Sequence, residues 1–188
     1  MPYPAQVTPE RIVEQAAEMI EAEGVEALSL GRLASALGIK APSLYRYFEG
    51  KTALLRAVNL ATNEQLVAAM HTAADAAADD AYDRLLTMMR AYRTFAHTRP
   101  AAYMLAYGDT TAPPDPDALL ALALPLQAAV AAWSGEAGSL PALRGLWALV
   151  HGYVALELTR NFQRGGDLDA TFDQIVRTYL AGLKTLAE

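Results

Sequence analysis

Side chains that could bind a polyanion gather between residues 42 and 51. Tyr45, Arg46 and Tyr47 follow Pro42 closely, and Lys51 comes four residues after the second tyrosine. Arginine and lysine bind phosphate oxygens, arginine also reads guanine, and an aromatic edge packs against the methyl group of thymine. These residue types therefore suit a nucleic-acid groove. The alternative is a solvated face of a small helical bundle whose tyrosines are partly buried.

The charge of the chain is unevenly distributed. The formal net charge is −6, which argues against a protein that binds nucleic acid over its whole surface. Residues 1–28 contain six glutamates and a single arginine, Arg11. Residues 29–56 contain one acid, Glu49, and five cations: Arg32, Lys40, Arg46, Lys51 and Arg56. The one positive patch of the sequence thus coincides with the stretch described above.

Other chemistries find little support in the sequence. The chain has no cysteine, which excludes disulfides, thiolate zinc sites and cysteine nucleophiles and is consistent with a cytoplasmic location. His71, His97 and His151 fall on different predicted helices, so we expect no metal site. No GxSxG motif, phosphate loop or nucleophile beside a base is present, so neither an enzyme nor a cofactor is expected. The first residues lack the pattern of a signal peptide, and secretion is not expected.

The elements that must position the basic stretch are all predicted to be helices, because apolar residues recur at helical spacing and no strand pattern occurs. A first helix is expected over residues 9–23, with Thr8 as its N-cap and Gly24 as its stop. A short helix follows over residues 30–36, capped by Ser29, and a second short helix is opened by Pro42 and closed by Gly50. A long helix then begins at Lys51 and reaches about residue 73.

Further helices are expected along the rest of the chain. They cover residues 82–98, capped by Asp79 or Asp80, and a brief helix from Pro100 to near Gly108. The apolar run over residues 118–133 follows Asp115 and Pro116; at 16 residues it falls short of the roughly 20 that a membrane span needs, so we expect a buried helix and no membrane contact. Ser139 is interpreted as a cap, an apolar helix follows over residues 143–158, and Asp169 is expected to cap the last helix.

The two short helices and the turn between them predict a helix-turn-helix. Gly38 permits the positive φ of a tight turn. Burial against the first helix is expected for Leu33, Ala34, Leu37, Ile39 and Leu44, which directs Ser43, Arg46 and Tyr47 outward and leaves Tyr45 at the margin. The predicted fold is all-α: an N-terminal three-helix DNA-binding domain over residues 1–55, joined by the long fourth helix to a helical bundle over residues 56–188.

The sequence "LSLGRLASALGIKAPSLYRYFEGKTALLRAV", residues 28–58, resembles the DNA-binding segment of the TetR family of transcriptional regulators. A second stretch, "LWALVHGYVALEL", resembles the Trp-x-x-x-His-Gly element of one C-terminal subfamily through Trp147, His151 and Gly152. Gly31 departs from the family pattern, because some members place a base-reading side chain there. The resemblance implies phosphate contacts by Ser29 and Arg32, base contacts near Lys40, Ala41 and Pro42, phosphate clamps at Ser43, Tyr47 and Lys51, and base or backbone contacts by Tyr45 and Arg46.

The larger half is expected to bind a second copy and a small molecule. The apolar face of the last two helices either packs within one chain or forms a homodimer; the dimer candidates are Val154, Leu158, Phe172, Ile175, Val176, Tyr179 and Leu183. Methionines and aromatic residues at helical spacing form either plain core or a ligand pocket. The pocket candidates are Met88, Phe95, Tyr103, Met104, Tyr107, Trp147, His151 and Glu157. A lone histidine such as His151 is usually a hydrogen-bonded core residue.

The sequence therefore predicts a ligand-responsive transcriptional regulator, a repressor that binds a pseudo-palindromic DNA operator as a homodimer and is released by a small, largely apolar effector. The helix that begins at Lys51 is expected to transmit the effector signal. Two alternatives remain open: a helical enzyme that uses His151 with Glu157 or a tyrosine, and a helical small-molecule carrier or scaffold without DNA binding.

Overall fold

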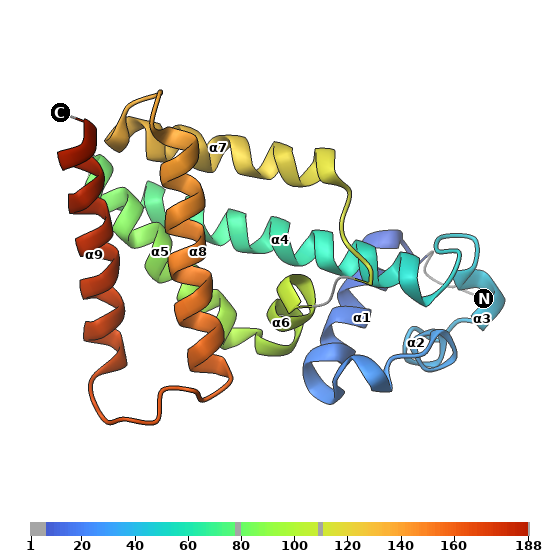
Figure 1. Cartoon of the computed structure of the whole chain (residues 1–188). Coiled ribbons are helices and arrows are strands. Elements are labelled where there is room, and N and C mark those ends of the chain that lie inside the picture. Colours follow the sequence, from blue (N-terminus) through green and yellow to red (C-terminus); the bar gives the residue numbers. More distant parts are fainter. Residues whose placement is uncertain (1–6, 78–79, 109–110, 188) are drawn as a thin grey trace. The chain divides into compact units, whose positions relative to one another are not determined.

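The computed structural model describes residues 7–77, 80–108 and 111–187, and these residues form helices without any strand (Figure 1). In chain order the elements are α1 (Pro9–Glu23), the 3-10 helix η1 (Val25–Ala27), α2 (Leu30–Ala36), α3 (Ala41–Leu44), α4 (Lys51–Asp75), α5 (Ala81–Thr98), α6 (Pro100–Gly108), α7 (Pro116–Ser134), α8 (Ser139–Leu158) and α9 (Leu168–Ala187). The all-α fold class expected from the sequence is confirmed.

The chain divides into two compact units. The first contains residues 1–63 together with 99–119, and the second contains residues 64–98 and 120–188. The division therefore falls inside α4, after Asn63, rather than at the expected position after residue 55. The first unit also takes in α6 and the segment that follows it, which the sequence had assigned to the larger half.

Local signals set the ends of the first helices. The Thr8 hydroxyl accepts a hydrogen bond from the Arg11 amide at 3.3 Å, and Pro9 occupies the first turn, where its missing N–H costs nothing. Gly24, with φ of +83°, closes α1 by donating its N–H to the Ile20 carbonyl. The Ser29 hydroxyl caps α2 in the same way as Thr8 caps α1. The sequence predicted both helices with these bounds.

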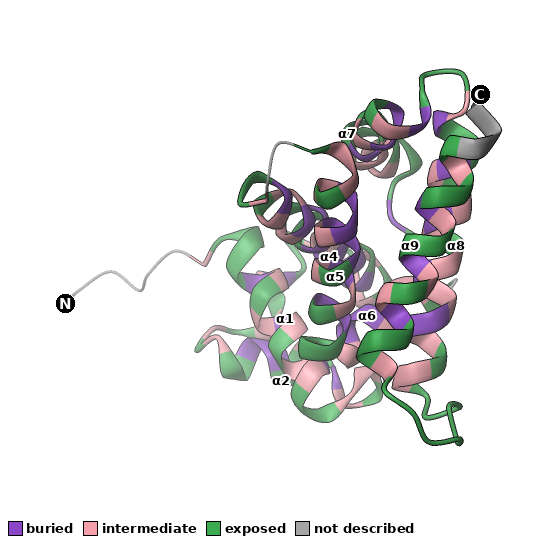
Figure 2. Cartoon of the chain, turned by 90° about the vertical axis from the view of Figure 1, so that its left-hand side faces the viewer, coloured by how far each residue is buried: buried purple, intermediate pink, exposed green. Residues whose placement is uncertain are grey.

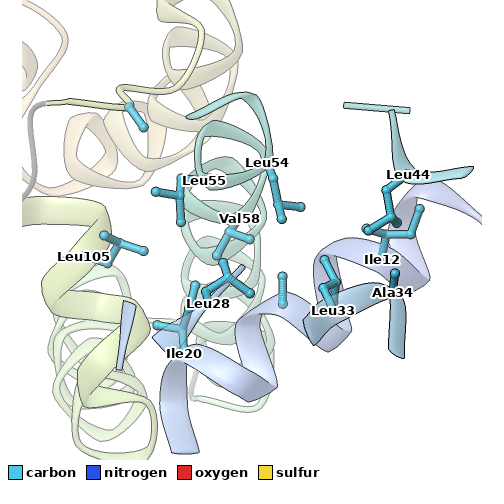
Figure 3. Packing of buried hydrophobic residues seen from close by; sticks show 12 residues of the cluster. Ile12, Ile20, Leu28, Leu33, Ala34, Leu44, Leu54, Leu55, Val58 and Leu105 are labelled. Carbon is cyan, nitrogen blue, oxygen red and sulfur yellow. The ribbon is translucent and has the colours of Figure 1, made fainter. Parts of the chain in front are cut away.

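A single apolar cluster holds the first unit together (Figure 3). Leu33 and Leu44 are fully buried beside Ile12 of α1, and Leu54 joins them from α4. Leu105 of α6 lies in the same cluster. Burying a leucine side chain stabilises a fold by about 1.5–3 kcal/mol, so this cluster fixes the small helices on which the basic stretch is carried.

The second unit packs α5, α8 and α9 against one another, and buried residues recur along α9 at helical spacing (Figure 2). The guanidinium of Arg90 on α5 pairs with the Asp173 carboxylate on α9. From α7, the Trp133 indole donates to the Leu180 carbonyl at 2.8 Å, while the Lys184 ammonium lies 4.2 Å from the centre of the Trp133 ring. An ion pair to α5 and polar and cation–π contacts to α7 thus hold α9 in place in addition to apolar packing.

Several expected boundaries differ in the structure. The second short helix ends at Leu44 rather than near Gly50, because the amide of Tyr47 bonds the carbonyl three residues back and the chain continues as a turn. Asp167, not Asp169, caps α9: its carboxylate accepts from the amides of residues 169 and 170. Ser139 begins α8 and donates its hydroxyl to the Glu136 carbonyl, so it is not a side-chain cap. Of the two expected caps of α5, Asp80 accepts from the Tyr82 amide, and Asp79 lies outside the described residues.

The apolar helix α7 is buried on one side only. Leu126 and Val130 are buried, whereas Leu120 and Leu124 are 57% and 56% exposed, so the expectation of a buried helix holds for its C-terminal half alone. Among the described residues α7 is also the one helix long and apolar enough to cross a membrane by length and composition. The same two properties are found in core helices, and Pro125 lies in the middle of this one.

Candidate nucleic-acid interface

The tight turn between α2 and α3 is built as the sequence predicts. Gly38 has φ of +67°, a value that favours glycine, and its N–H donates to the Ser35 carbonyl. The Ile39 amide then bonds the Ala34 carbonyl at 2.9 Å, and Ile39 packs on the apolar cluster. The turn therefore packs half-buried Leu37 and Ile39 against the apolar cluster and leaves Lys40 and Pro42 exposed.

The residues after Leu44 form the exposed part of this site. Tyr45 is 57% exposed and Tyr47 is 37% exposed, and Arg46 between them is exposed as well. Leu44 is fully buried and Phe48 packs on the same cluster, so the two anchor this turn from either side. Two exposed aromatic rings and a guanidinium provide stacking surface, hydroxyl donors and positive charge, which suit contact with DNA bases and phosphates.

The cations of the patch fall into two groups. Lys40 and Arg46 are exposed and make no hydrogen bond or ion pair with any residue that the structure describes. By contrast, Arg32 pairs with the Glu23 carboxylate at 2.7 Å and donates to the Ala27 carbonyl at 2.8 Å. The Lys51 ammonium donates to the Val25 carbonyl at 3.0 Å. Lys40 and Arg46 are therefore immediately available to phosphates, whereas Arg32 and Lys51 also hold η1 in place.

The remaining expected contacts lie on the same short elements. Ser29 and Pro42 are exposed, and Ala41 and Ser43 are half-buried. Gly31, the departure from the family pattern, is exposed on α2 with open space around the position of a Cβ, so its lack of a side chain is not required by packing.

The expected pocket residues do not gather in one place. Met88 and Trp147 lie in the second unit and line a small void of about 10 Å³, together with Met70, Leu85, Met89, Leu126, Val130, Leu143 and Leu146. Tyr103, Met104 and Tyr107 lie on α6 in the first unit. Phe95 is buried on α5. Burial lowers the pKa of half-buried His151 and favours its neutral form.

The Glu157 carboxylate forms an ion pair with Arg93. The guanidinium of Arg93 donates to its carboxylate at 2.9 Å, His97 contacts the same group at 2.8 Å, and the Glu157 side chain is only 7% exposed. The hydrogen bonds from Arg93 hold the pKa of Glu157 below its ordinary value and outweigh the opposing effect of burial. Arg93 also pairs with Asp169 and lies over the Phe172 ring, so this network joins α5, α8 and α9.

The expected dimer residues are divided between core and surface. Val154, Phe172 and Val176 are buried within one chain, which removes them from any intermolecular face. Leu158, Ile175, Tyr179 and Leu183 are half-buried. Other positions on these helices face outward at four-residue spacing. On α8, Ala148 and Leu156 are exposed and Gly152 between them is half-buried; on α9, Gln174, Thr178 and Gly182 are exposed.

Sequence reasoning missed the buried polar residues of the first unit. Asn59 and Asn63 of α4 are fully and almost fully buried, and the Tyr107 hydroxyl donates to Asn63 at 2.7 Å. Burial raises the pKa of Tyr107, so the phenol is protonated and remains a donor. Two asparagines four residues apart on an otherwise apolar helix face were the available signal.

Comparison with known proteins places this geometry in a family. Residues 12–58 match the family described as "Bacterial regulatory proteins, tetR family", and residues 85–179 match "Tetracyclin repressor-like, C-terminal domain". The chain is 32% identical over 186 residues to an HTH-type transcriptional regulator of Mycobacterium tuberculosis, with 96% of this chain and 84% of that protein covered.

Solved structures share the fold. A protein of Rhodococcus sp. RHA1 superposes with a TM-score of 0.80 at 24% identity over 98% of this chain and 99% of that one. A TetR variant of Acinetobacter baumannii AYE, solved in complex with minocycline, gives a TM-score of 0.70 at 22% identity over 97% and 99%. Matches in both halves, together with the full-length relative and the exposed Tyr45–Tyr47 turn, show that the chain belongs to the TetR family of helix-turn-helix transcriptional regulators.

Proposed function

We propose that this protein is a cytoplasmic, ligand-responsive repressor without enzymatic activity, which binds a pseudo-palindromic DNA operator as a homodimer. The observation that carries the proposal is the turn after Leu44, where Tyr45, Arg46 and Tyr47 are exposed on a chain of net charge −6. Lys40, just before α3, is exposed as well and pairs with none of the described residues. Positive charge that is concentrated on one small anchored element favours local docking to a duplex over adhesion along the whole surface.

We call residues 45–47 the reading segment, and homodimerisation supplies a second copy of it. A two-fold dimer presents two copies of the segment to half-sites about 34–36 Å apart, which matches one turn of the duplex. Small residues at four-residue spacing favour close packing of helices from two copies: Ala148 and Gly152 on α8, and Thr178 and Gly182 on α9. The exposed Leu156 of α8 adds apolar area. Ile175 and Tyr179, which are half-buried in one chain, supply additional apolar area at this face.

The effector would bind in the second unit. The void lined by Met88, Met89 and Trp147 is too small for any ligand as it stands, but methionine side chains are unbranched and repack at low cost. An effector there would be small and largely apolar, because nine apolar side chains line the void. The minocycline complex of the Acinetobacter relative supports the view that this fold accommodates a multi-ring molecule.

The alternative of an enzyme that uses His151 with Glu157 is weakened by the ion pair on that carboxylate. Both oxygens of Glu157 accept hydrogen bonds from Arg93, so the group is a poor proton acceptor for a reaction at His151.

Genome-wide recovery of DNA fragments bound by the purified protein tests the proposal. We expect a pseudo-palindromic site whose affinity falls steeply with salt and which binds two chains. A double variant, Arg46→Ala with Tyr47→Ala, should lose the site, whereas Arg84→Ala, a loss of positive charge in the other unit, should retain it. If wild-type protein recovers no fragment above background in dilute buffer, the proposal is wrong.

A further inference from the structure

Two cations bind the carbonyl groups of η1, the short helix that joins α1 to the helix-turn-helix. The Arg32 guanidinium, on α2, donates to the Ala27 carbonyl at 2.8 Å. The Lys51 ammonium, at the start of α4, donates to the Val25 carbonyl at 3.0 Å. Both acceptors belong to η1, so the two cations play the same structural part. A difference in their surroundings therefore bears on what else each of them can bind.

The two cations differ in their counter-ions. Nη2 of Arg32 donates to both carboxylate oxygens of Glu23, the last residue of α1, at 2.7 Å and 2.9 Å. Lys51, by contrast, forms no ion pair with any residue that the structure describes. The positive charge of Arg32 is thus balanced by a carboxylate within the first unit, whereas the charge of Lys51 is not.

The balanced pair makes a phosphate contact by Arg32 unfavourable. Its guanidinium already donates three hydrogen bonds, two to Glu23 and one to Ala27. An exposed ion pair contributes little to stability by itself, so a phosphate could displace Glu23 from Arg32. The displaced carboxylate would then lie unpaired beside a polyanion and be repelled by it. The exposed Glu26 of η1 adds a second negative charge to the same part of the chain.

Sequence-independent DNA binding depends on the number of phosphates that the protein neutralises, because each one releases condensed cations from the duplex. A cation that is already balanced by a carboxylate adds nothing to that number when it exchanges one anion for another. Arg32 should therefore be missing from the salt dependence of binding, although it is exposed and lies two residues after the start of α2. Lys51 should be present in it.

We propose that Glu23 is a positioning residue that holds Arg32 away from DNA phosphates and so limits sequence-independent binding. This inference rests on the proposed regulator function. It differs from the phosphate contact that the family resemblance implies for Arg32. The probe that tests it is a scrambled duplex, on which affinity comes from charge rather than from contacts to bases.

The slope of log affinity against log salt on that duplex is measured by fluorescence anisotropy in five proteins. They are wild type, Glu23→Gln, Arg32→Ala, the double variant that combines these two changes, and Glu18→Gln. Glu18→Gln is the matched control, because it makes the same change in net charge on the same helix. It releases no cation, since its partner Arg11 remains paired with Glu14 at 2.7 Å.

We expect Glu23→Gln to steepen the slope by about one, because the released guanidinium then neutralises a phosphate. Between about 50 and 200 mM salt, that extra contact corresponds to a further loss of affinity of about threefold. Arg32→Ala alone and Glu18→Gln should keep the wild-type slope. The double variant should return to the wild-type slope, because the cation that Glu23→Gln releases is absent from it.

A purely structural role of Glu23 predicts a different result. If the pair only held η1 in place, Glu23→Gln would lower the midpoint of thermal unfolding and leave the slope unchanged, which overturns the proposal. So does a slope that falls by about one in Arg32→Ala alone, or that stays steep in the double variant. Equal steepening in Glu23→Gln and Glu18→Gln would assign the effect to net charge and also overturn it. If wild-type protein binds neither the operator nor the scrambled duplex, the regulator function itself fails, which is a separate result.

Discussion

The Tyr179 side chain of α9 lies directly over Gly145 of α8, where a Cβ atom would come within 2.0 Å of the Tyr179 hydroxyl oxygen and 2.8 Å of the ring carbon that bears it. The same hydroxyl donates to the Ala142 carbonyl at 3.1 Å. Any side chain at position 145 would therefore displace the Tyr179 ring from its present position.

Gly145→Ala should lower the free energy of unfolding by about 1–3 kcal/mol, because the added methyl group displaces the Tyr179 ring and weakens its hydrogen bond to the Ala142 carbonyl. Urea unfolding followed by circular dichroism measures this. Gly31→Ala is the control, since open space surrounds that helical position on α2, and it should be neutral or stabilising by up to about 1 kcal/mol. Equal changes in the free energy of unfolding for the two substitutions would contradict the close contact between Gly145 and Tyr179.

Removal of the guanidinium from the Arg93–Glu157 pair should be costly. Arg93→Met leaves an almost buried carboxylate with only His97 as a partner, and we expect a loss of about 3–5 kcal/mol in the free energy of unfolding. Arg84→Met removes the exposed pair with Asp75 and should cost less than about 1 kcal/mol. Adding Glu157→Leu to Arg93→Met should restore part of the loss, and a double variant as unstable as the single one would contradict the ion-pair explanation.

The same pair predicts an acid-sensitive stability. The folded-state pKa of Glu157 lies below its ordinary value of 4.5, so the carboxylate contributes stability at neutral pH that is lost as the pH falls through the folded-state pKa. The free energy of unfolding should therefore decline below about pH 4.5 less steeply in Glu157→Gln than in wild type. Glu64→Gln, which changes an exposed carboxyl of α4, should retain the wild-type slope. Identical slopes for wild type and Glu157→Gln would show that the pair does not respond to pH.

Lys51 is expected both to contact a DNA phosphate and to stabilise η1, and the salt dependence of DNA binding distinguishes the two roles. Lys51→Ala should weaken binding to all DNA sequences and reduce the slope of log affinity against log salt by about one, because one phosphate contact is lost. It should also lower the free energy of unfolding by up to about 1 kcal/mol, since the Val25 carbonyl keeps the Leu28 amide as a donor but loses the Lys51 ammonium. An unchanged salt slope with lowered stability would assign Lys51 to holding η1 alone.

Tyr45 should contribute to sequence preference. It is the most exposed aromatic residue of the reading segment, and Tyr45→Ala should reduce affinity for the operator by about 1–3 kcal/mol while affecting a scrambled duplex much less. Fluorescence anisotropy with both duplexes measures the two losses. Equal losses would reassign Tyr45 to contact with the DNA backbone.

Local signals explain why much of the helical organisation was predictable. Thr8 and Ser29 each determine a helix start by accepting a hydrogen bond from an amide three residues later, and the fixed φ of Pro100 favours the first position of α6. Those starts agree with the sequence prediction. The outward positions of Arg46 and Tyr47 were also foreseen, because the apolar residues around them leave only one side for polar residues. Two expectations were wrong: Tyr45, which was placed at the margin, is more exposed than Tyr47, and Ser43 is half-buried rather than outward.

Features that depend on distant residues were not predictable. Val154, Phe172 and Val176 were assigned to a dimer face, but the three are covered by their own chain, and periodicity does not reveal which partner covers an apolar face. Tyr107 was assigned to the ligand half, yet its hydroxyl bonds Asn63, 44 residues earlier in the chain. The hydrogen bonds that the Glu21 carboxylate accepts from the Ala101 and Ala102 amides were missed for the same reason, since α6 begins some 80 residues after Glu21.

The most direct measurement is the affinity of the wild-type protein for the recovered operator and for a scrambled duplex of the same length, titrated over a range of salt concentrations with the bound mass determined. Binding of two chains per operator is predicted, with a preference over the scrambled duplex of at least about a thousandfold and an affinity that falls linearly with salt on logarithmic axes. Equal affinity for the two duplexes, or a bound complex that contains a single chain, would contradict sequence-specific reading by a pair of Tyr45–Tyr47 turns.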